Sequence, residues 1–409
     1  MWESQPKRKE FNKVNILYIS ISFPKNGKNI YTDLAEELGK KNKITVLTAE
    51  EEKNIKCTEL NEEKNFEVLR VKTGNIFNVN LIEKAISYIT LQQKLKKAIK
   101  KYLKQRQYDL IIFMAPPVTL AKVVKYAMKK YNAKSYLMQK DIFPENALDL
   151  GILKKWNPAY YYFRYKEKQM YKIATKIGCM SYGNIEYIKK HNKFIPENKL
   201  ELFPNTIKIS EDYKNKKDYD IRKKFNIPLE ATIAIYGGNF GKPQGISFIL
   251  EVLNEYRNRK DIFFIFSGKG TEKKKIFDYV KNYKIENVIT VEYMQKEEYD
   301  KILKNVDIGL IFLDYRFTIP NIPSRTLSYF EYSIPILAAT DKNTDYKDII
   351  VNQAKAGLWC ESNNVREFKE KLDYLIANKE KRIELGINGR KFLEDNWTVE
   401  KSVKILEKI

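Results

Sequence analysis

Residues 320–337 read Pro-Asn-Ile-Pro-Ser-Arg-Thr-Leu-Ser-Tyr-Phe-Glu-Tyr-Ser-Ile-Pro-Ile-Leu, which predicts a loop, a helix and then a buried strand. Ser324 is a good N-cap residue, because its hydroxyl can accept a hydrogen bond from a backbone N–H of the first turn. Apolar residues at i, i+3 and i+7 predict one buried helical face, formed by Leu327, Phe330 and Ile334. Pro335 ends this helix. The start of this helix brings together free N–H groups, the positive end of the helix dipole and Arg325, and this combination is suited to binding a phosphate or diphosphate. The alternative is an ordinary capped helix with a surface arginine.

The same alternation of strands and helices runs through the whole chain. Strands are expected at residues 14–20, 44–48, 110–114, 135–139, 176–180 and 200–203, and again at 232–236, 262–267, 288–291, 308–313 and 336–339. Such alternation is typical of parallel α/β sheets, and a charged stretch at 209–224 is expected to be a linker between two series. We therefore predict an α/β fold of two tandem, doubly wound Rossmann-like domains that face each other across a cleft. The expected domains are residues 1–206 and 207–395, with a last helix in 396–409 that packs back on the first domain.

Composition excludes several classes of protein. The chain has 409 residues, of which 43% are apolar, so it can build real cores. Its three cysteines are widely spaced and its single histidine lies in a lysine-rich stretch, so neither a disulfide framework nor a zinc site is indicated. No apolar run reaches the roughly 18 residues of a membrane span, and residues 1–13 lack the apolar core of a signal peptide. A cytoplasmic location is expected.

The charge predicts an anionic partner. Lysine and arginine number 75 against 52 acids, a net charge of +23, which attracts nucleic acid, an anionic membrane face or phosphate-bearing substrates. No nucleic-acid-binding motif is present, so we expect no nucleic-acid partner. Residues 84–106 hold eight lysines or arginines and no acid, beside an apolar stripe. This pattern fits two structures equally: a helix lying on the inner face of the membrane, assisted by the aromatic patch at 160–165, or a domain helix packed on a sheet.

Two glycine-rich segments follow strands of the second series. Gly237–Gly245 reads Gly-Gly-Asn-Phe-Gly-Lys-Pro-Gln-Gly, and Ser267–Gly270 reads Ser-Gly-Lys-Gly. Glycines let backbone amides approach a bulky anion and permit positive φ. Neither segment is a dinucleotide fingerprint or a P-loop, and a plain strand–helix turn is the alternative for each. Together with Ser324 and Arg325, they place anion-binding features at three strand ends, and this convergence is more specific than any one of them.

These three segments, in this order, resemble the second domain of family 4 glycosyltransferases of the GT-B fold. They are most similar to the branch that builds bacterial capsule, O-antigen and colanic-acid-type polysaccharides. In the first half, Lys140-Asp141-Ile-Phe-Pro-Glu145 resembles the Arg-Asp-Leu-Trp-Pro-Glu segment of that branch, and Ser181 and Phe203-Pro204-Asn205 match landmarks at the end of the first domain. The resemblance implies transfer of a sugar, with retention of configuration, from a nucleotide diphosphate sugar, UDP being favoured. The implied acceptor is a glycan or a lipid-linked sugar, and no metal or other cofactor is implied.

The resemblance also implies roles for single residues. The implied diphosphate contacts are Gly238, Asn239, Lys242, Gln244, Gly268, Lys269, Gly270, Ser324, Arg325 and Thr326. Tyr293 and Met294 are implied to line the base pocket. The implied catalytic residues are Lys140, Asp141 and Glu145, of which the first two would stabilise the leaving phosphate or position the acceptor hydroxyl. The alternative for this last segment is a capped loop before a helix.

One departure from the family concerns its paired acids. Relatives commonly carry an acid at the positions of Ser328 and Pro320, where the first of these binds the ribose; Glu331, one turn on, is the candidate substitute. The missing pair leaves an alternative open, namely a nucleotide-sugar epimerase or a non-catalytic transferase-like subunit on the same fold. Asp218-Tyr219-Asp220 matches the Asp-x-Asp string of metal-dependent transferases. It lies in the charged linker and not at a strand end, so a solvated charge run is predicted there.

Overall fold

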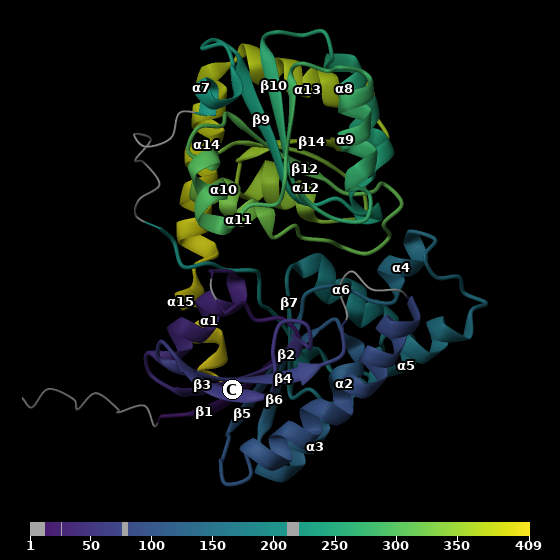
Figure 1. The fold of residues 1–409 in the computed structure, drawn as a ribbon, viewed down its shortest axis with the longest axis vertical. Helices are drawn as coiled ribbons and strands as arrows, with labels where there is room; N and C mark the ends of the chain where they lie inside the picture. Colours follow the sequence, from purple (N-terminus) through teal and green to yellow (C-terminus); the bar gives the residue numbers. More distant parts are fainter. Residues whose placement is uncertain (1–12, 26, 76–80, 211–220) are drawn as a thin grey trace, which may run out of the picture.

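The computed structural model describes residues 13–25, 27–75, 81–210 and 221–409. Two α/β sheets lie in two lobes, one above the other in Figure 1, and the first half of the chain forms the lower lobe. The fold class predicted from the sequence is confirmed, because each lobe is a mostly parallel sheet with helices on both faces. Asp218 and Asp220 lie outside the described residues.

The first lobe contains an eight-stranded sheet with the order β3-β4-β2-β1-β5-β6-β7-β8. Its strands are β1 (Asn15–Ser20), β2 (Lys43–Glu51), β3 (Glu59–Glu63), β4 (Phe66–Thr73), β5 (Leu110–Ala115), β6 (Lys134–Gln139), β7 (Lys176–Cys179) and β8 (Leu200–Leu202). Only β3 runs antiparallel to its neighbour. Its helices are α1 (Ile30–Gly39), α2 (Leu81–Tyr102), α3 (Ala121–Tyr131), α4 (Glu145–Asp149), α5 (Pro158–Ile173) and α6 (Tyr182–His191). Neither β3 nor β4 was predicted: β3 is rich in glutamates and lies at the sheet's edge, and β4 interrupts its apolar residues with Glu67, Arg70 and Lys72.

The second lobe contains a six-stranded, all-parallel sheet with the order β11-β10-β9-β12-β13-β14. Its strands are β9 (Thr232–Asn239), β10 (Ile262–Lys269), β11 (Val288–Val291), β12 (Ile308–Phe312), β13 (Ile336–Thr340) and β14 (Gly357–Glu361). Its helices are α7 (Ile221–Phe225), α8 (Ile246–Tyr256), α9 (Lys273–Asn282), α10 (Lys296–Leu303), α11 (Arg325–Glu331), α12 (Tyr346–Asp348), α13 (Val365–Ala377) and α14 (Lys379–Asn396). The strand order reverses between β9 and β12, and ligands of such sheets bind beyond the strand ends at that point.

The end of the predicted linker is wrong. Residues 221–225 form α7, and Ile221 is fully buried in the core of the second lobe. Arg222, Lys223 and Lys224 separate the two apolar residues of this helix, Ile221 and the partly buried Phe225, so its composition alone is that of a linker.

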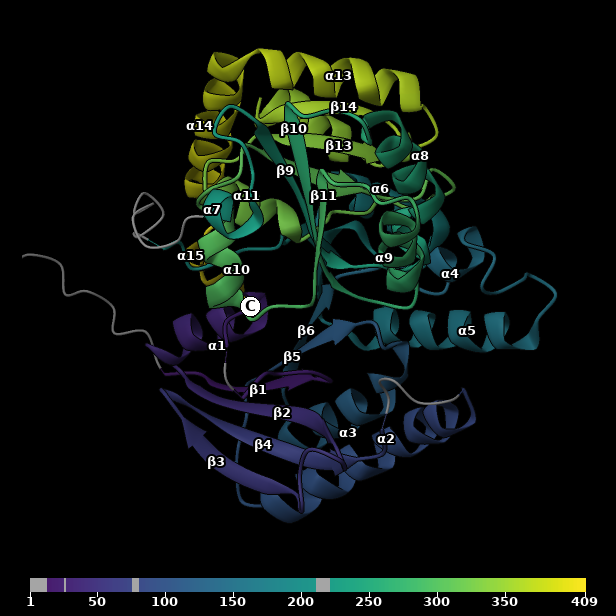
Figure 2. The same ribbon diagram turned by 45° about the horizontal axis from the view of Figure 1, so that its top comes forward.

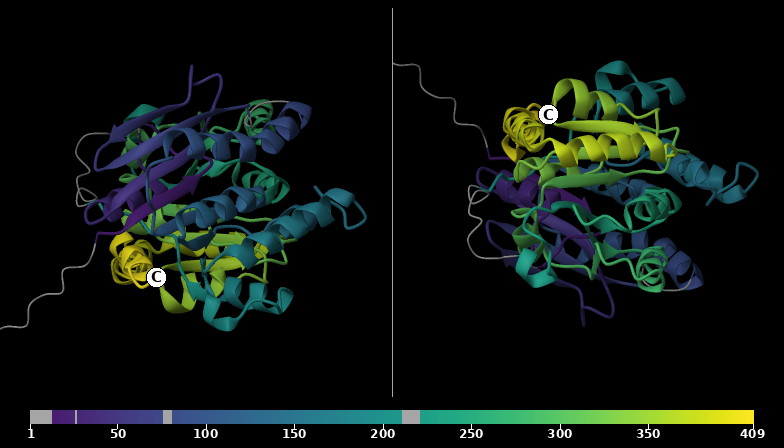
Figure 3. Two further views of the ribbon diagram at one scale, coloured as in Figure 1. Left: turned by 90° about the horizontal axis from the view of Figure 1, so that it is seen from below. Right: turned by 90° about the horizontal axis from the view of Figure 1, so that it is seen from above.

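Two crossings of the chain join the lobes. Ile207 and Thr398 pair as an isolated parallel bridge, and the hydroxyls of Thr206 and Ser402 lie 2.8 Å apart. The last helix, α15 (Val399–Leu406), then lies against α1 of the first lobe (Figures 2 and 3). Its buried residues Val399, Val403 and Leu406 join the same apolar cluster as strands β1 and β2. The chain thus returns to the lobe in which it began.

The basic helix α2 is a domain helix. Leu91, Leu95 and Ile99 of its apolar stripe are fully buried in the first lobe's core. The phenol of Tyr102 donates a hydrogen bond to the carbonyl of Thr58. The sheet therefore already covers the apolar stripe that would have to enter a bilayer. The prediction that α2 lies on a membrane through this stripe is wrong. Within the described residues, no helix is long and apolar enough to cross a bilayer.

Candidate functional site

The two glycine segments lie side by side at the carboxyl ends of β9 and β10. These strands pair in parallel, with Gly238 opposite Gly268 and Asn239 opposite Lys269. Gly238 has a φ of 138° and Gly268 a φ of 156°, both in the region that favours glycine. A Cβ on Gly268 would lie 1.8 Å from the carbonyl oxygen of Gly238. The two strand ends can approach this closely only because neither residue has a side chain.

Arg325 comes to the same point from α11. An ideal Cβ on Gly238 would lie 1.7 Å from its Nη2 atom. The guanidinium also stacks on the ring of Tyr236, with Cζ 4.2 Å from the ring centroid. Its strongest electrostatic neighbours are the phenols of Tyr236, Tyr329 and Tyr299. None of the ion pairs formed by the described residues includes Arg325. This cation is therefore partly buried with no carboxylate to neutralise it.

Four more predicted residues border this point. The Asn239 amide donates a 3.1 Å hydrogen bond to Oε1 of Gln244, and the Gly241 N–H donates to the same oxygen. Lys269 Nζ lies 4.4 Å from the ring centroid of Tyr293, whose side chain is 52% exposed. These contacts hold the two amides over the turn and leave the Lys269 ammonium free of any ion pair within the described residues.

Thr326 and Glu331, two further residues predicted to contact the donor, bond other parts of the protein. The Thr326 hydroxyl is buried and bonds the Tyr346 hydroxyl at 2.6 Å. Glu331 is 2% exposed; its Oε1 accepts a 2.9 Å hydrogen bond from the Ser210 N–H, and its Oε2 lies 3.7 Å from Lys296. Glu331 thus ties the second lobe to the crossing segment, and it is not free to bind a ribose.

Ser324, Ser328, Met294 and Lys242, which are also predicted to contact the donor, form no side-chain hydrogen bond with the part of the chain that the structure describes. Ser324 occupies the N-cap position but makes no side-chain cap, because its own backbone is already helical. The predicted cap is therefore wrong. Ser328 and Met294 are partly buried, and Met294 packs on the core. Lys242 is exposed and lines a separate cavity beside α8. The roles of these residues stay predictions.

The catalytic candidates of the first lobe follow β6. Lys140 is partly buried with Nζ 5.2 Å from the Phe203 ring centroid, and burial lowers its pKa to about 7. Burial raises the pKa of Asp141 to about 6. One Asp141 oxygen accepts from Asn146, and the other is buried with no hydrogen-bond partner. Glu145 instead accepts a 2.7 Å hydrogen bond from the Tyr160 hydroxyl, which directs it toward α5.

A cavity of about 830 Å³ lies between the lobes. Asn239, Lys269 and Gly270 line it from the second lobe, and the loops after β1 and β2 line it from the first. The predicted cleft is therefore present. Arg70, which the sequence analysis missed, also lines it; its guanidinium donates to the Phe23 carbonyl and to Glu63, which fixes the loop after β1. No sequence signal distinguishes Arg70 from the many surface cations.

Carboxylates also fix the lobes to each other. Asp345 accepts hydrogen bonds from the Ser181 hydroxyl and the Gly183 N–H at 2.9 and 2.7 Å, so it lies at the N-terminus of α6, where the helix dipole favours an anion. Asp149 accepts a 2.7 Å hydrogen bond from the Thr318 N–H. Neither acid is part of a motif, so only the fold reveals their use. Within the described residues, no group of three His, Cys, Asp or Glu side chains is placed to hold a metal.

Comparison with known proteins finds similarity to glycosyltransferases. Residues 217–392 match the family model described as glycosyl transferases group 1. The chain is 24% identical over 277 residues to the probable glycosyltransferase WbjE of Pseudomonas aeruginosa, covering 65% of this chain and 66% of that protein. It is 22% identical over 224 residues to the O-antigen biosynthesis glycosyltransferase WclY of Escherichia coli, covering 53% and 56%. The alignments thus span between about half and two thirds of these curated relatives.

Solved structures resemble the whole chain. Sucrose-phosphate synthase of Thermosynechococcus elongatus superposes with a TM-score of 0.75 at 14% identity, covering 97% of this chain and 98% of that one. The fold is GT-B. WaaG, a glycosyltransferase of lipopolysaccharide biosynthesis, has a TM-score of 0.65 at 14% identity, covering 95% and 99%. Anabaena HepE in complex with UDP and glucose has a TM-score of 0.67 at 12% identity, covering 97% and 98%.

Replacement of Gly238 by alanine tests the close approach of Arg325. The new Cβ would overlap Nη2, so the guanidinium must move, and we expect UDP affinity to fall about tenfold or more by isothermal titration calorimetry. The matched control is Gly151→Ala: this glycine also has positive φ, at 66°, but no atom lies within 4 Å of its Cβ position. Equal UDP affinity in both variants would show that the Gly238–Arg325 contact is irrelevant to binding.

The two perturbed pKa values predict a bell-shaped pH profile of kcat/KM. In the role that the resemblance implies, Asp141 must be ionised to hold the acceptor hydroxyl, so we expect activity to rise as pH passes about 6. In its implied role, Lys140 must keep its proton to stabilise a leaving phosphate, so we expect activity to fall as pH passes about 7. Asp141→Asn should remove the acid limb and Lys140→Met the alkaline limb. His191→Gln, which removes the sole histidine, should leave both limbs in place; a profile that follows His191 would contradict these assignments.

Proposed function

We propose that this chain is a glycosyltransferase that moves a sugar from a nucleotide diphosphate sugar to a glycan or lipid-linked acceptor, with retention of configuration, in bacterial surface polysaccharide synthesis. It is proposed to need no metal or other cofactor, and UDP is the favoured nucleotide. The relatives named for O-antigen biosynthesis and the structures solved with UDP support this proposal. The single observation that carries it is the unpaired Arg325 guanidinium against the positive-φ glycines.

The burial of the Arg325 charge calls for a partner of opposite charge. A partly buried cation is expensive unless it is paired and hydrogen-bonded. Around Arg325 the chain offers three phenols and glycine backbone, but no carboxylate among the described residues. A diphosphate would supply the missing negative charge, and guanidinium groups bind phosphate oxygens through two parallel hydrogen bonds. Because Gly238 and Gly268 have no side chains, the Arg325 guanidinium and the two strand ends can come together at this point.

The first lobe supports the acceptor half of the reaction. Asp141 presents one carboxylate oxygen that has no partner within the protein, and Lys140 lies next to it in sequence. Both follow β6, which ends at the same edge of its sheet as β1 and β5. We assign to Asp141 the positioning of the acceptor hydroxyl, and to Lys140 the stabilisation of the departing phosphate. Glu145 is proposed only to position α5 through Tyr160.

A panel of nucleotide sugars tests the proposal. With a lipid-linked or oligosaccharide acceptor, we expect release of free nucleoside diphosphate and a glycosylated product, detected by mass spectrometry. Sugar isomerisation without an acceptor would support the epimerase alternative. Binding with no turnover would support a non-catalytic subunit.

Arg325→Ala should weaken UDP binding about 10- to 150-fold, because a hydrogen bond to a charged group contributes about 1.5–3 kcal/mol. Arg325→Lys should lie between the two, since it keeps the charge but loses the planar fork. The control is Arg257→Ala, which removes an exposed arginine at the end of α8. Unchanged UDP affinity in Arg325→Ala would contradict the site.

Because the proposed acceptor is lipid-linked, we also propose an anionic membrane as a partner. The loop between α4 and α5, together with the first part of α5, forms the surface that would contact it. Five large apolar side chains between residues 152 and 165 are exposed, with fractions of 47–75%; they are Ile152, Trp156, Tyr161, Tyr162 and Tyr165. Exposed lysines at 154, 155 and 168 flank them, and the segment's only acid, Glu167, is buried against Arg164. Aromatic residues and lysines suit the interface of an anionic bilayer. Figure 3 shows α5 and the loop before it projecting from the side of the molecule.

Flotation with vesicles tests this surface. We expect the protein to float with phosphatidylglycerol vesicles at low salt, and much less with phosphatidylcholine or at high salt. Replacing both Trp156 and Tyr165 by serine should weaken binding about tenfold or more, because each ring buries apolar area. Tyr374→Ser, which removes a 46% exposed tyrosine of the other lobe, is the control. Equal flotation of both variants, or no flotation at low salt, would remove the surface from the proposal.

A further inference from the structure

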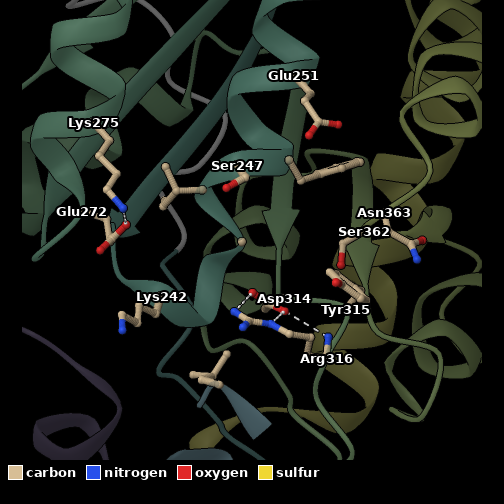
Figure 4. A pocket seen from close by; sticks show the side chains of 14 residues that line it. Lys242, Ser247, Glu251, Glu272, Lys275, Asp314, Tyr315, Arg316, Ser362 and Asn363 are labelled. Carbon is tan, nitrogen blue, oxygen red and sulfur yellow. Dashed lines mark hydrogen bonds and ion pairs between the residues drawn. The ribbon is translucent and has the colours of Figure 1, made fainter. Parts of the chain in front are cut away.

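A second cavity, of about 540 Å³, lies beside the start of α8 (Figure 4). We call it the α8 cavity. Its walls are the first turn of α8, the segment at the start of α9, and the loops after β12 and β14. Leu150 of the first lobe completes it. The cavity is thus open toward the junction of the lobes, where Asp149 bonds Thr318. Of the residues predicted to bind the donor or to act in catalysis, Lys242 lines this cavity, and Lys140, Asp141, Gly238, Gly268 and Arg325 do not.

The charges that line the α8 cavity cancel. Its three cations are Lys242, Lys275 and Arg316, and its three acids are Glu251, Glu272 and Asp314. Arg316 forms two 2.8 Å hydrogen bonds with the Asp314 carboxylate, and Lys275 pairs with Glu272, as Figure 4 shows. Two of the three cations are paired with acids of the cavity, while Lys242 and Glu251 form no ion pair within the described residues. A free anion or cation would gain little in this environment, because the lining has as many acids as cations. The lining therefore favours a neutral ligand.

The lining also offers hydrogen bonds that the protein itself does not use. Ser362 is 3% exposed, and its buried hydroxyl has no hydrogen-bond partner. A buried hydroxyl without a partner is costly, so a ligand that bonds it gains that energy. Ile246 and Ser247 begin α8, where N–H groups have no acceptor within the helix, and Gly245 supplies no side-chain cap. Tyr315, 47% exposed, adds a flat apolar ring at the rim.

We propose that the α8 cavity binds a neutral sugar unit of the acceptor glycan, one that lies beyond the reacting sugar. A pyranose carries hydroxyls that both donate and accept hydrogen bonds, and it has apolar C–H faces that pack on an aromatic ring. The sugar hydroxyls would bond the Ser362 hydroxyl, the first backbone amides of α8 and the paired carboxylates. A C–H face of the sugar would pack on the Tyr315 ring. A glycan whose reacting end lies in the cleft reaches this cavity past Leu150. The inference rests on the proposed function for its acceptor, but the binding itself does not depend on catalysis.

Saturation-transfer-difference NMR tests this site. The probes are maltotriose, methyl galactopyranoside and N-acetylglucosamine, each added with saturating UDP so that the donor site is occupied. At least one of these sugars should bind saturably to the parent protein. Tyr315→Ala and Ser362→Ala should each weaken that binding about fivefold, the effect of one lost hydrogen bond or ring contact. Tyr374→Ala, which lies near the far end of α13 and does not line the cavity, should leave it unchanged.

The outcomes separate the two proposals. No saturable sugar binding, or sugar binding that is equal in the parent, Tyr315→Ala and Ser362→Ala, overturns the α8 cavity as a glycan site. Saturable binding of inorganic phosphate, weakened by the same variants and not accompanied by sugar binding, overturns it in favour of an anion site. If sugar binding depends on Tyr315 and Ser362 but Arg325→Ala leaves UDP affinity unchanged, the α8 cavity is supported as a glycan site. The proposed donor site at Arg325 is then rejected.

Discussion

The unpaired charge of Arg325 is the constraint on which the rest of the second lobe depends. Its guanidinium stacks on Tyr236 and is pressed against Gly238, where any side chain would displace it. The chain surrounds this cation with phenols and bare backbone. A bound anion would supply the opposite charge that the described residues do not place beside this cation, which is the arrangement expected of a diphosphate site.

The strand order brings the pieces of this site together. The reversal between β9 and β12 leaves a crevice at the carboxyl ends of the strands. The parallel register places Gly238 beside Gly268, and α11 begins after the loop that follows β12. The first lobe adds a partly desolvated pair, Lys140 and Asp141, at the corresponding edge of its own sheet. Asp149 and Asp345 then hold the two edges toward each other.

Much of this could be predicted from the sequence, because glycines at strand ends and buried β-branched runs are local signals. The convergence of Gly238, Gly268 and Arg325 followed from the order of the segments, since parallel strands end at one edge. The uses of Thr326 and Glu331 could not be predicted in the same way. Thr326 bonds Tyr346 and Glu331 bonds Ser210, and no local sequence pattern predicts these contacts. β3 was missed for a related reason, because an edge strand needs only one covered face and can be rich in charge.

A crystal structure of the complex with UDP tests the central claim most directly. The account predicts that diphosphate oxygens lie within hydrogen-bond distance, about 2.7–3.2 Å, of the Arg325 guanidinium and of backbone amides at the ends of β9 and β10. It further predicts that the base lies on the side of Tyr293. A complex in which UDP binds with its diphosphate away from Gly238 and Gly268, while Arg325 stays stacked on Tyr236 with no anion against it, would contradict the account.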